Sequence, residues 1–211
     1  MIQLAAIHLI SDGKLDIAHF AAMAAAVHPL LDFIHLREKQ RSARELLDMT
    51  AKLIQAGVPA SKLVINDRVD VALAACAAGI QLAWNSLPPA AARAAAPAMR
   101  LGKSVHSVQE AEEAGRQGAD FCLFGHVFPS VCKPGQLERG LAQLADAVSA
   151  SSIPLIAIGG ITPANTGLVI RQGAAGIAVM SGICSAPDPL VAACAYRTAV
   201  IQADGKGGEG A

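Results

Sequence analysis

Short apolar runs alternate with longer segments of helical periodicity along the whole chain. The apolar runs cover residues 2–10, 31–38, 62–67, 79–83, 100–106, 120–126, 154–160 and 176–182. Several are nearly continuous in Ile, Val and Leu, which is typical of strands that are buried on both faces. The segments with a helical pattern cover residues 14–27, 43–56, 69–76, 88–96, 107–117, 137–149, 163–172 and 187–200. The pattern therefore predicts eight strand–helix pairs.

The number and order of these pairs indicate an α/β protein with parallel strands. Eight pairs in a chain of 211 residues favour a single-domain (β/α)8 TIM barrel over residues 1–201, and a doubly wound sheet is the alternative. No G-x-G-x-x-G sequence follows the first strand, so the usual dinucleotide-binding motif is absent. The last ten residues, 202–211, predict a flexible C-terminal tail.

Several residues mark where the predicted helices begin and end. Ser107 is expected to cap the helix that follows it, and Glu110 stands three residues later, which is the spacing of a capping box. Gly57, Gly118 and Gly173 stand where helices are expected to stop, because glycine readily adopts the left-handed conformation of a helix C-terminus.

Composition and charge narrow the class of protein. Hydrophobic residues make up 53% of the chain, and 17 basic residues balance 17 acidic ones, so nothing indicates binding to nucleic acid or to a membrane surface. The five cysteines form no C-x-x-C pair, which favours a reducing compartment. No stretch of about 18 charge-free apolar residues suits a membrane span. We therefore expect a soluble, cytoplasmic protein.

Polar residues and glycines gather where the predicted strands end. In a TIM barrel the active site lies at the C-terminal ends of the strands, so these residues should meet at one rim. They are Arg37, Glu38 and Lys39; Asn66, Asp67 and Arg68; Ser104 and His106; His126, Cys132 and Lys133; Gly159 and Gly160; and Ser181 and Gly182.

Two of these strand ends have the character of a phosphate site. "IGGIT" places Gly159 and Gly160 after the seventh strand, and "MSGI" places Ser181 and Gly182 after the eighth. Glycine lets the backbone approach a ligand closely, and the loops after strands seven and eight commonly bind phosphate in this fold. These sequences therefore favour a phosphate site, and ordinary turn glycines are the alternative interpretation.

His126 is the strongest candidate for acid–base chemistry. It follows Gly125 at the end of the sixth strand, and its ordinary pKa suits proton transfer near neutral pH. A structural or purely binding histidine is the alternative. Cys132 is a weaker candidate as a nucleophile. The set His106, His126 and Cys132 matches no established metal-binding spacing, so we expect neither a metal nor a cofactor.

A set of motifs resembles the thiamine-phosphate synthase superfamily. The motifs are "HLREK", "INDRVDVALA", "GKSVHS", "ADFCLFGHVFPSVCKPG", "IPLIAIGGITPAN" and "GAAGIAVMSGI", which run in order from residue 35 to residue 183. The resemblance implies a TIM barrel that binds a thiazole phosphate, with the phosphate held by the "IGG" and "SG" loops.

The chain departs from the synthase pattern at two loops. Synthases typically have Gly-Gln-Glu-Asp after strand four, with its Asp helping to bind Mg²⁺, and this chain ends that segment with Ser86. After strand six, synthases typically have Gly-Pro and then Thr-x-Thr-Lys. Here His126, Ser130 and Cys132 replace the proline and the two threonines, and Lys133 is retained. These departures resemble the sister group of thiazole tautomerases.

The tautomerase resemblance implies an isomerase, which shifts a proton without a cofactor and aromatises the carboxythiazole phosphate made by thiazole synthase in thiamine biosynthesis. In that hypothesis the catalytic residues are His126, Ser104 and His106, the substrate-binding residues are Arg37, Lys39, Asn66 and Lys133, and the phosphate-binding residues are Gly159, Gly160, Ser181 and Gly182. It implies a functional link to thiazole synthase and allows a homo-oligomer. The alternatives are a Mg²⁺-dependent thiamine-phosphate synthase and a non-catalytic regulator that binds thiazole phosphate.

Overall fold

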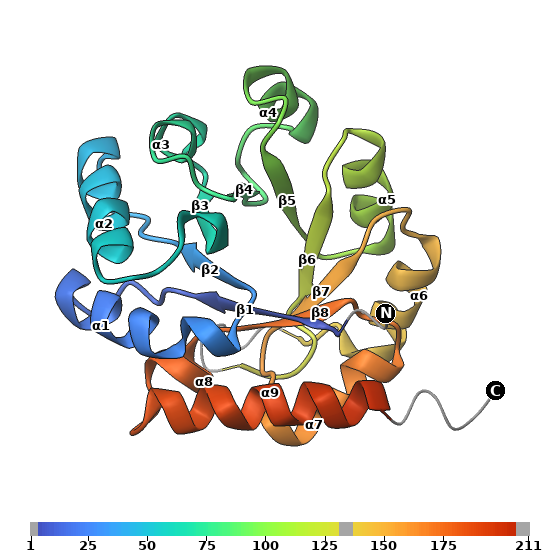
Figure 1. Cartoon of the computed structure of the whole chain (residues 1–211). Helices are drawn as coiled ribbons and strands as arrows, with labels where there is room; N and C mark the ends of the chain where they lie inside the picture. Colours follow the sequence, from blue (N-terminus) through green and yellow to red (C-terminus); the bar gives the residue numbers. More distant parts are fainter. Residues whose placement is uncertain (1–3, 131–136, 206–211) are drawn as a thin grey trace.

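The protein is a closed barrel of eight parallel strands with helices outside it (Figure 1). The computed structural model describes residues 4–130 and 137–205. Neighbouring strands pair in sequence order, and β8 closes the ring on β1. The strands are β1 (Ala6–Ile10), β2 (Phe33–Leu36), β3 (Leu63–Asn66), β4 (Gly79–Leu82), β5 (Arg100–Val105), β6 (Phe121–Gly125), β7 (Leu155–Ile158) and β8 (Gly176–Val179). The predicted (β/α)8 TIM barrel is confirmed, and the doubly wound alternative is wrong.

A helix follows each strand, as the periodicity predicts. The helices are α1 (Ile17–Val27), α2 (Ala43–Gln55), α3 (Val69–Ala74), α4 (Pro89–Ala95), α5 (Val108–Arg116), α6 (Gly140–Ala150), α7 (Pro163–Arg171), α8 (Ser181–Cys184) and α9 (Pro189–Gly205), with 3-10 turns η1 (His28–Leu30) and η2 (Ala60–Lys62). The short α8 is not anticipated by the sequence pattern. The expected start of the tail falls inside α9, and residues 206–211 of that tail lie outside the described residues.

The residues predicted to cap or stop helices are confirmed with one exception. Gly57, Gly118 and Gly173 follow the ends of α2, α5 and α7 with φ values of 103°, 85° and 86°, in the left-handed region that glycine tolerates. The Ser107 hydroxyl accepts from the backbone N–H of Glu110 at 3.2 Å, so it caps α5. The capping box is wrong, however, because the Glu110 carboxylate accepts from the backbone N–H of His106 at 2.6 Å.

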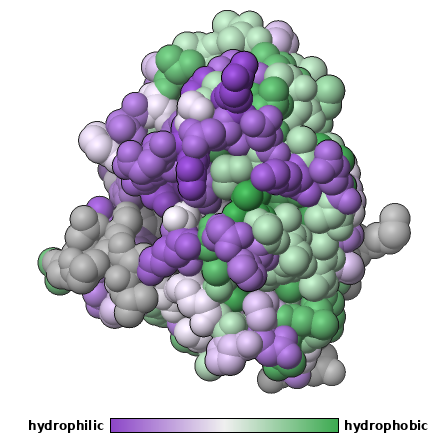
Figure 2. Space-filling view, turned by 90° about the vertical axis from the view of Figure 1, so that its left-hand side faces the viewer, coloured by the Kyte–Doolittle hydropathy of each residue, from purple (hydrophilic) through white to green (hydrophobic). Residues whose placement is uncertain are grey.

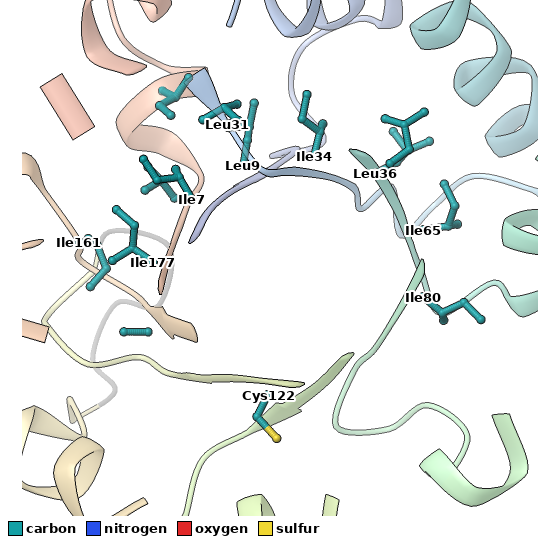
Figure 3. Packing of buried hydrophobic residues seen from close by; sticks show 14 of the residues in the cluster. Ile7, Leu9, Leu31, Ile34, Leu36, Ile65, Ile80, Cys122, Ile161 and Ile177 are labelled. Atoms are coloured by element: carbon teal, nitrogen blue, oxygen red, sulfur yellow. The ribbon is translucent and has the colours of Figure 1, made fainter. Parts of the chain in front are cut away.

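The main hydrophobic core lies between the barrel and the helices. Figure 3 shows Ile7, Leu9, Ile34, Leu36 and Ile65 pointing outward from the ring of strands, and all five are buried. Burying a side chain of this size contributes about 1.5–3 kcal/mol, so this shell dominates the stability of the fold. The opposite faces of the strands are thereby left free to line the inside of the barrel.

The barrel interior has one apolar wall and one polar wall. A second hydrophobic cluster, built mainly on β6–β8, contains Ile10, Phe121, Leu123, Ile156 and Ala178. The polar wall lies on β1–β4, where the side chains of His8, His35 and Gln81 are buried. His8 Nδ1 and His35 Nε2 are 2.8 Å apart, so the two rings share a hydrogen bond below the rim.

Hydrophilic and hydrophobic residues occupy different parts of the molecular face drawn in Figure 2. Figure 2 shows hydrophilic residues across the left and centre of that face, with hydrophobic residues at its top and right. In the described part of the chain, no helix has the length and apolar character needed to cross a membrane.

Candidate active site

The barrel brings the described candidate residues to one rim, because all strands are parallel and end at the same side. Two groups form there. One lies at the ends of β3, β4 and β5, and the other at the ends of β6, β7 and β8. Cys132 and Lys133 lie outside the described residues, so their predicted roles stay predictions.

The first group centres on Asp67, which follows β3. Its Oδ1 accepts hydrogen bonds from the Ser86 hydroxyl and from the backbone N–H of Ala83, the latter at 3.1 Å. Asp67 has a φ of 61°, a left-handed conformation that aspartate tolerates better than most residues. The backbone thus holds the carboxylate against the loop after β4, where Ser86 stands in place of the second carboxylate of the synthase pattern.

Two buried amide oxygens lie on the strands beside this carboxylate. Asn66 and Gln81 are register partners on β3 and β4, and Gln81 Nε2 donates to the Ser104 hydroxyl on β5 at 3.1 Å. Asn66 Oδ1 and Gln81 Oε1 are buried, and neither has a hydrogen-bond partner among the described residues. Because an unpaired buried acceptor costs free energy, both oxygens are suited to a donor or a cation brought by a ligand.

The oxygen atoms of this group fit a magnesium ion held with one protein carboxylate. Asp67, Ser86 and Asn66 offer a carboxylate, a hydroxyl and an amide oxygen, and Mg²⁺ prefers oxygen ligands and is commonly held by one or two carboxylates together with substrate phosphates. Residues 4–130 and 137–205 contain no cluster of three or more His, Cys, Asp or Glu side chains that could hold a metal alone. A substrate phosphate would therefore have to complete the coordination.

Lys103, whose role the sequence left open, lies beside the same group. Its Nζ donates to the backbone carbonyl of Ala83 at 2.5 Å. Burial lowers the pKa of Lys103 from its ordinary value, and the nearby carboxylates of Asp67 and Glu110 oppose that change. Lys103 is therefore a cation held close to the Asp67 carboxylate.

The end of β2 is held by a buried serine that the sequence patterns do not reveal. The Ser11 hydroxyl accepts from the backbone N–H of Arg37 at 2.8 Å and donates to Glu38 Oε1 at 2.7 Å. Ser11 is 1% exposed, and its two partners are partly buried. This serine ties the loop after β1 to the segment that carries Arg37 and Lys39.

The second group contains His126, which is buried at the end of β6. Its backbone carbonyl accepts from the N–H of Arg139 at 2.9 Å. Gly159 lies against it, because a Cβ at Gly159 would stand 2.2 Å from the Cβ of His126. The segment after β6 therefore packs tightly on the segment after β7, and the imidazole of His126 is largely shielded from solvent.

Close packing explains why glycines follow β7. Gly159 and Gly160 have φ values of 98° and 65°, and a Cβ at Gly160 would stand 2.4 Å from the carbonyl oxygen of Pro129. The backbone N–H of Phe128 donates to the Gly159 carbonyl at 3.0 Å. The alternative interpretation as turn glycines is thus sufficient to account for both residues, and their predicted role in binding phosphate stays a prediction.

Tyr196 links the ends of β7 and β8, and sequence reasoning missed it. Its hydroxyl donates to the carbonyl of Ile161 at 2.9 Å, and a Cβ at Gly182 would stand 2.2 Å from that hydroxyl oxygen. Ser181 and Gly182 begin α8 at this point. The only sequence signal was that Tyr196 is the single tyrosine of the chain.

His106 is bound to the start of α5. Its Nδ1 lies 3.5 Å from Glu110 Oε2, which also accepts from the His106 backbone N–H. Ser104, its predicted catalytic neighbour, instead accepts from Gln81. The two residues thus contact different partners, one on the helix and one inside the barrel.

Comparison with known proteins identifies the family. The sequence model described as thiamine monophosphate synthase matches residues 7–183. The chain belongs to the thiamine monophosphate synthase family. It is 46% identical to a thiamine-phosphate synthase of Chlorobium luteolum over 77% of this chain and 78% of that protein. It is 38% identical to one of Methanoculleus marisnigri over 91% of this chain and 90% of that protein.

A solved structure agrees with this assignment. The thiamine phosphate pyrophosphorylase of Pyrococcus furiosus is 33% identical, has a TM-score of 0.83, and matches over 94% of this chain and 96% of that chain. A 3-hexulose-6-phosphate synthase with a TM-score of 0.74 and 21% identity shares the fold.

These relatives correct the enzyme class expected from the sequence. The assignment to the isomerases is wrong, because the family members to which the chain is similar are named thiamine-phosphate synthases, and a synthase of this kind is a transferase. The substitutions at Ser86 and His126 are compatible with the enzyme class of these relatives. Ser86 still contacts Asp67 directly, and His126 is packed into the loop after β6.

Proposed function

We propose that this protein is a thiamine-phosphate synthase, which joins a thiazole phosphate to a pyrimidine carried as its pyrophosphate ester. The observation that carries the proposal is the similarity to proteins named thiamine-phosphate synthase, at 38–46% identity over most of the chain. The oxygen donors and the cation at the ends of β3–β5 support it, because a reaction that releases pyrophosphate needs its negative charge to be offset.

The bond changes account for the residues at the rim. The lone pair of the thiazole ring nitrogen forms a bond to the methylene carbon of the pyrimidine, while the bond from that carbon to the pyrophosphate oxygen breaks. The leaving pyrophosphate takes the bonding electrons, and the thiazole becomes a thiazolium cation. The ring nitrogen carries no proton, so the step needs no base, and a shielded His126 is compatible with it.

In this proposal Asp67, with Ser86 and Asn66, would hold a magnesium ion. A bound Mg²⁺ would supply positive charge to the pyrophosphate oxygens. Arg37, Lys39, Lys103 and Lys133 would bind the remaining phosphate oxygens, as cations suited to that role. Gly159, Gly160, Ser181 and Gly182 would orient the phosphate of the thiazole substrate, so that its ring nitrogen faces the methylene carbon.

The test is a coupling assay with the purified protein. We expect stoichiometric formation of thiamine phosphate and pyrophosphate from the two substrates in the presence of Mg²⁺, and loss of both products when EDTA is added. Chromatography of thiamine phosphate and an enzymatic assay of pyrophosphate measure the two products independently. Absence of thiamine phosphate at any Mg²⁺ concentration would show that the proposal is wrong. A cytoplasmic location, a homo-oligomer and the link to thiazole synthase stay predictions.

Ser11 is expected to position Arg37 rather than to contact substrate. Replacing Ser11 with Ala removes two partly buried hydrogen bonds, each of which contributes about 0.5–1.5 kcal/mol, so the rim segment loosens. We expect KM for an anionic substrate to rise about 2- to 10-fold with kcat nearly unchanged, measured in the same coupling assay. Ser11→Thr retains the hydroxyl and should restore KM. If kcat of Ser11→Ala falls by as large a factor as KM rises, Ser11 does not act only by positioning the substrate-binding segment.

A further inference from the structure

A groove beside the barrel mouth extends beyond the residues assigned to the proposed reaction. It has a volume of about 490 Å³ and lies between α4 and α5, which are neighbours in the ring of helices (Figure 1). One wall is formed by Trp84 with Pro88 and Pro89, and the opposite wall by side chains of α5, including Glu110 and Glu113. The groove is thus apolar and aromatic on one side and acidic on the other.

The aromatic wall is accessible to a ligand. Trp84 is 76% exposed, although it stands only one residue after Ala83, whose backbone N–H binds Asp67. An exposed indole face attracts flat cationic groups through its negative π-face.

The charged side chains that line the groove carry a net formal charge of about −1, from two glutamates and one lysine. The Lys103 ammonium is directed to the Ala83 carbonyl at 2.5 Å, whereas Glu113 is held in place by the Gln117 amide at 2.6 Å and by Arg116 at 2.6 Å. Glu110 is fixed by the backbone N–H of His106. Two carboxylates and one ammonium therefore line the groove, and the Glu113 carboxylate is already ion-paired with Arg116, which lies outside the lining.

The groove is continuous with the candidate active site. Ser86 and Ser104 line it, and the same two residues contact Asp67 and Gln81 at the ends of β3–β5. The groove and the first group of rim residues therefore share a boundary, and Trp84 lies on the groove side of it.

We propose that this groove binds the thiazolium ring of the thiamine-phosphate product as it leaves the active site. The inference rests on the proposed function, because the coupling step creates the positive ring charge. The thiazole phosphate substrate has an uncharged ring, so the indole of Trp84 and the carboxylates of Glu110 and Glu113 distinguish product from substrate. The charge of a quaternary ring nitrogen cannot be lost by deprotonation, so this recognition does not depend on the protonation of the ligand.

The chain contains its own reporter for this groove, because Trp84 is its only tryptophan. We expect thiamine phosphate to quench the intrinsic tryptophan fluorescence in a saturable titration, and thiazole phosphate at equal concentration to leave it unchanged. Glu113→Gln should weaken thiamine phosphate binding by about two- to five-fold, the affinity change equivalent to an exposed ion pair. Glu112→Gln removes the same charge from an exposed position of α5 outside the groove and should leave the affinity unchanged.

A second variant and a second measurement separate the possible outcomes. Trp84→Leu should weaken thiamine phosphate binding in calorimetry while KM for both substrates in the coupling assay stays unchanged. If coupling occurs but Trp84→Leu and Glu113→Gln bind thiamine phosphate as tightly as the wild type, the groove proposal is overturned and the proposed function stands. If coupling fails but binding depends on Trp84 and Glu113, the groove is supported and the proposed function is overturned.

Discussion

Replacement of Asp67 with Asn is expected to lower kcat/KM for coupling by about 10²–10³-fold, the range seen when one preorganised charge-stabilising group is removed from an active site. Asp67 supplies the carboxylate among the oxygen donors at the ends of β3 and β4, where Ser86 supplies a hydroxyl. Asn has the same size and also tolerates the φ of 61°, so the substitution removes charge without backbone strain. Initial rates over a range of Mg²⁺ concentrations would measure the effect.

Adding a carboxylate beside Asp67 tests the proposed magnesium site in the opposite direction. Ser86→Asp restores the second carboxylate of the synthase pattern, so half-maximal activity should be reached at a lower Mg²⁺ concentration than in the wild type. Asn85→Asp is the matched control, because it adds the same charge at an exposed neighbouring position. If Asp67→Asn keeps wild-type activity, or if Asn85→Asp lowers the Mg²⁺ requirement as much as Ser86→Asp, the role given to Asp67 is wrong.

Hydrophobic periodicity located the eight strands, because each strand of a (β/α)8 barrel is covered on both sides. The outward residues, such as Ile34 and Ile65, and the inward residues, such as Ile156, are both apolar, so the strands appear as continuous runs. The short α8 was missed for the same reason. Residues 176–182 are apolar or small throughout, and nothing in that run marks the change from strand to helix at Ser181.

The expectation that the site lies at the C-terminal ends of the strands identified the residues of the rim. The contacts between these residues became visible only in the structure. Asn66, Asp67 and Ser104 were placed correctly at the ends of their strands. The pairing of Asp67 with Ser86, and of Gln81 with Ser104, depends on side-chain reach across strands, which periodicity does not encode. Ser11 and Tyr196 were missed because their hydrogen-bond partners are far away in the sequence.

The error in enzyme class has a physical origin. A histidine beside a glycine at a strand end is compatible with proton transfer, but it is equally compatible with a tightly packed turn. The position of Gly159 against the Cβ of His126 supports the packed turn. Similarly, replacement of a carboxylate by Ser86 removes a charge but keeps an oxygen that hydrogen-bonds to Asp67. Residue type alone could not distinguish these cases.

The buried histidine pair is expected to make the fold sensitive to mild acid. Burial, together with the positive charge of Arg100, lowers the pKa of His8 to about 3, and burial with the neighbouring His8 lowers the pKa of His35 well below its usual value. In the unfolded chain both histidines have a pKa of about 6.5. Below that pH the unfolded chain binds protons that the native protein does not, so the free energy of unfolding decreases as the pH falls.

The size of this effect follows from the number of protons involved. Each histidine contributes a slope of up to about 1.4 kcal/mol per pH unit below its unfolded pKa, so the pair should lower the free energy of unfolding by about 2–4 kcal/mol between pH 7.5 and pH 5. Urea unfolding at these two pH values would measure this decrease in the free energy of unfolding.

The double variant His8→Leu with His35→Met replaces both rings by apolar side chains and should lose most of this pH dependence. The control His19→Gln, at a largely exposed histidine of α1, should keep it. An identical pH dependence in the wild type and the double variant would mean that the two rings are protonated in the native barrel, because only a group whose pKa differs between the native and unfolded states can link stability to pH.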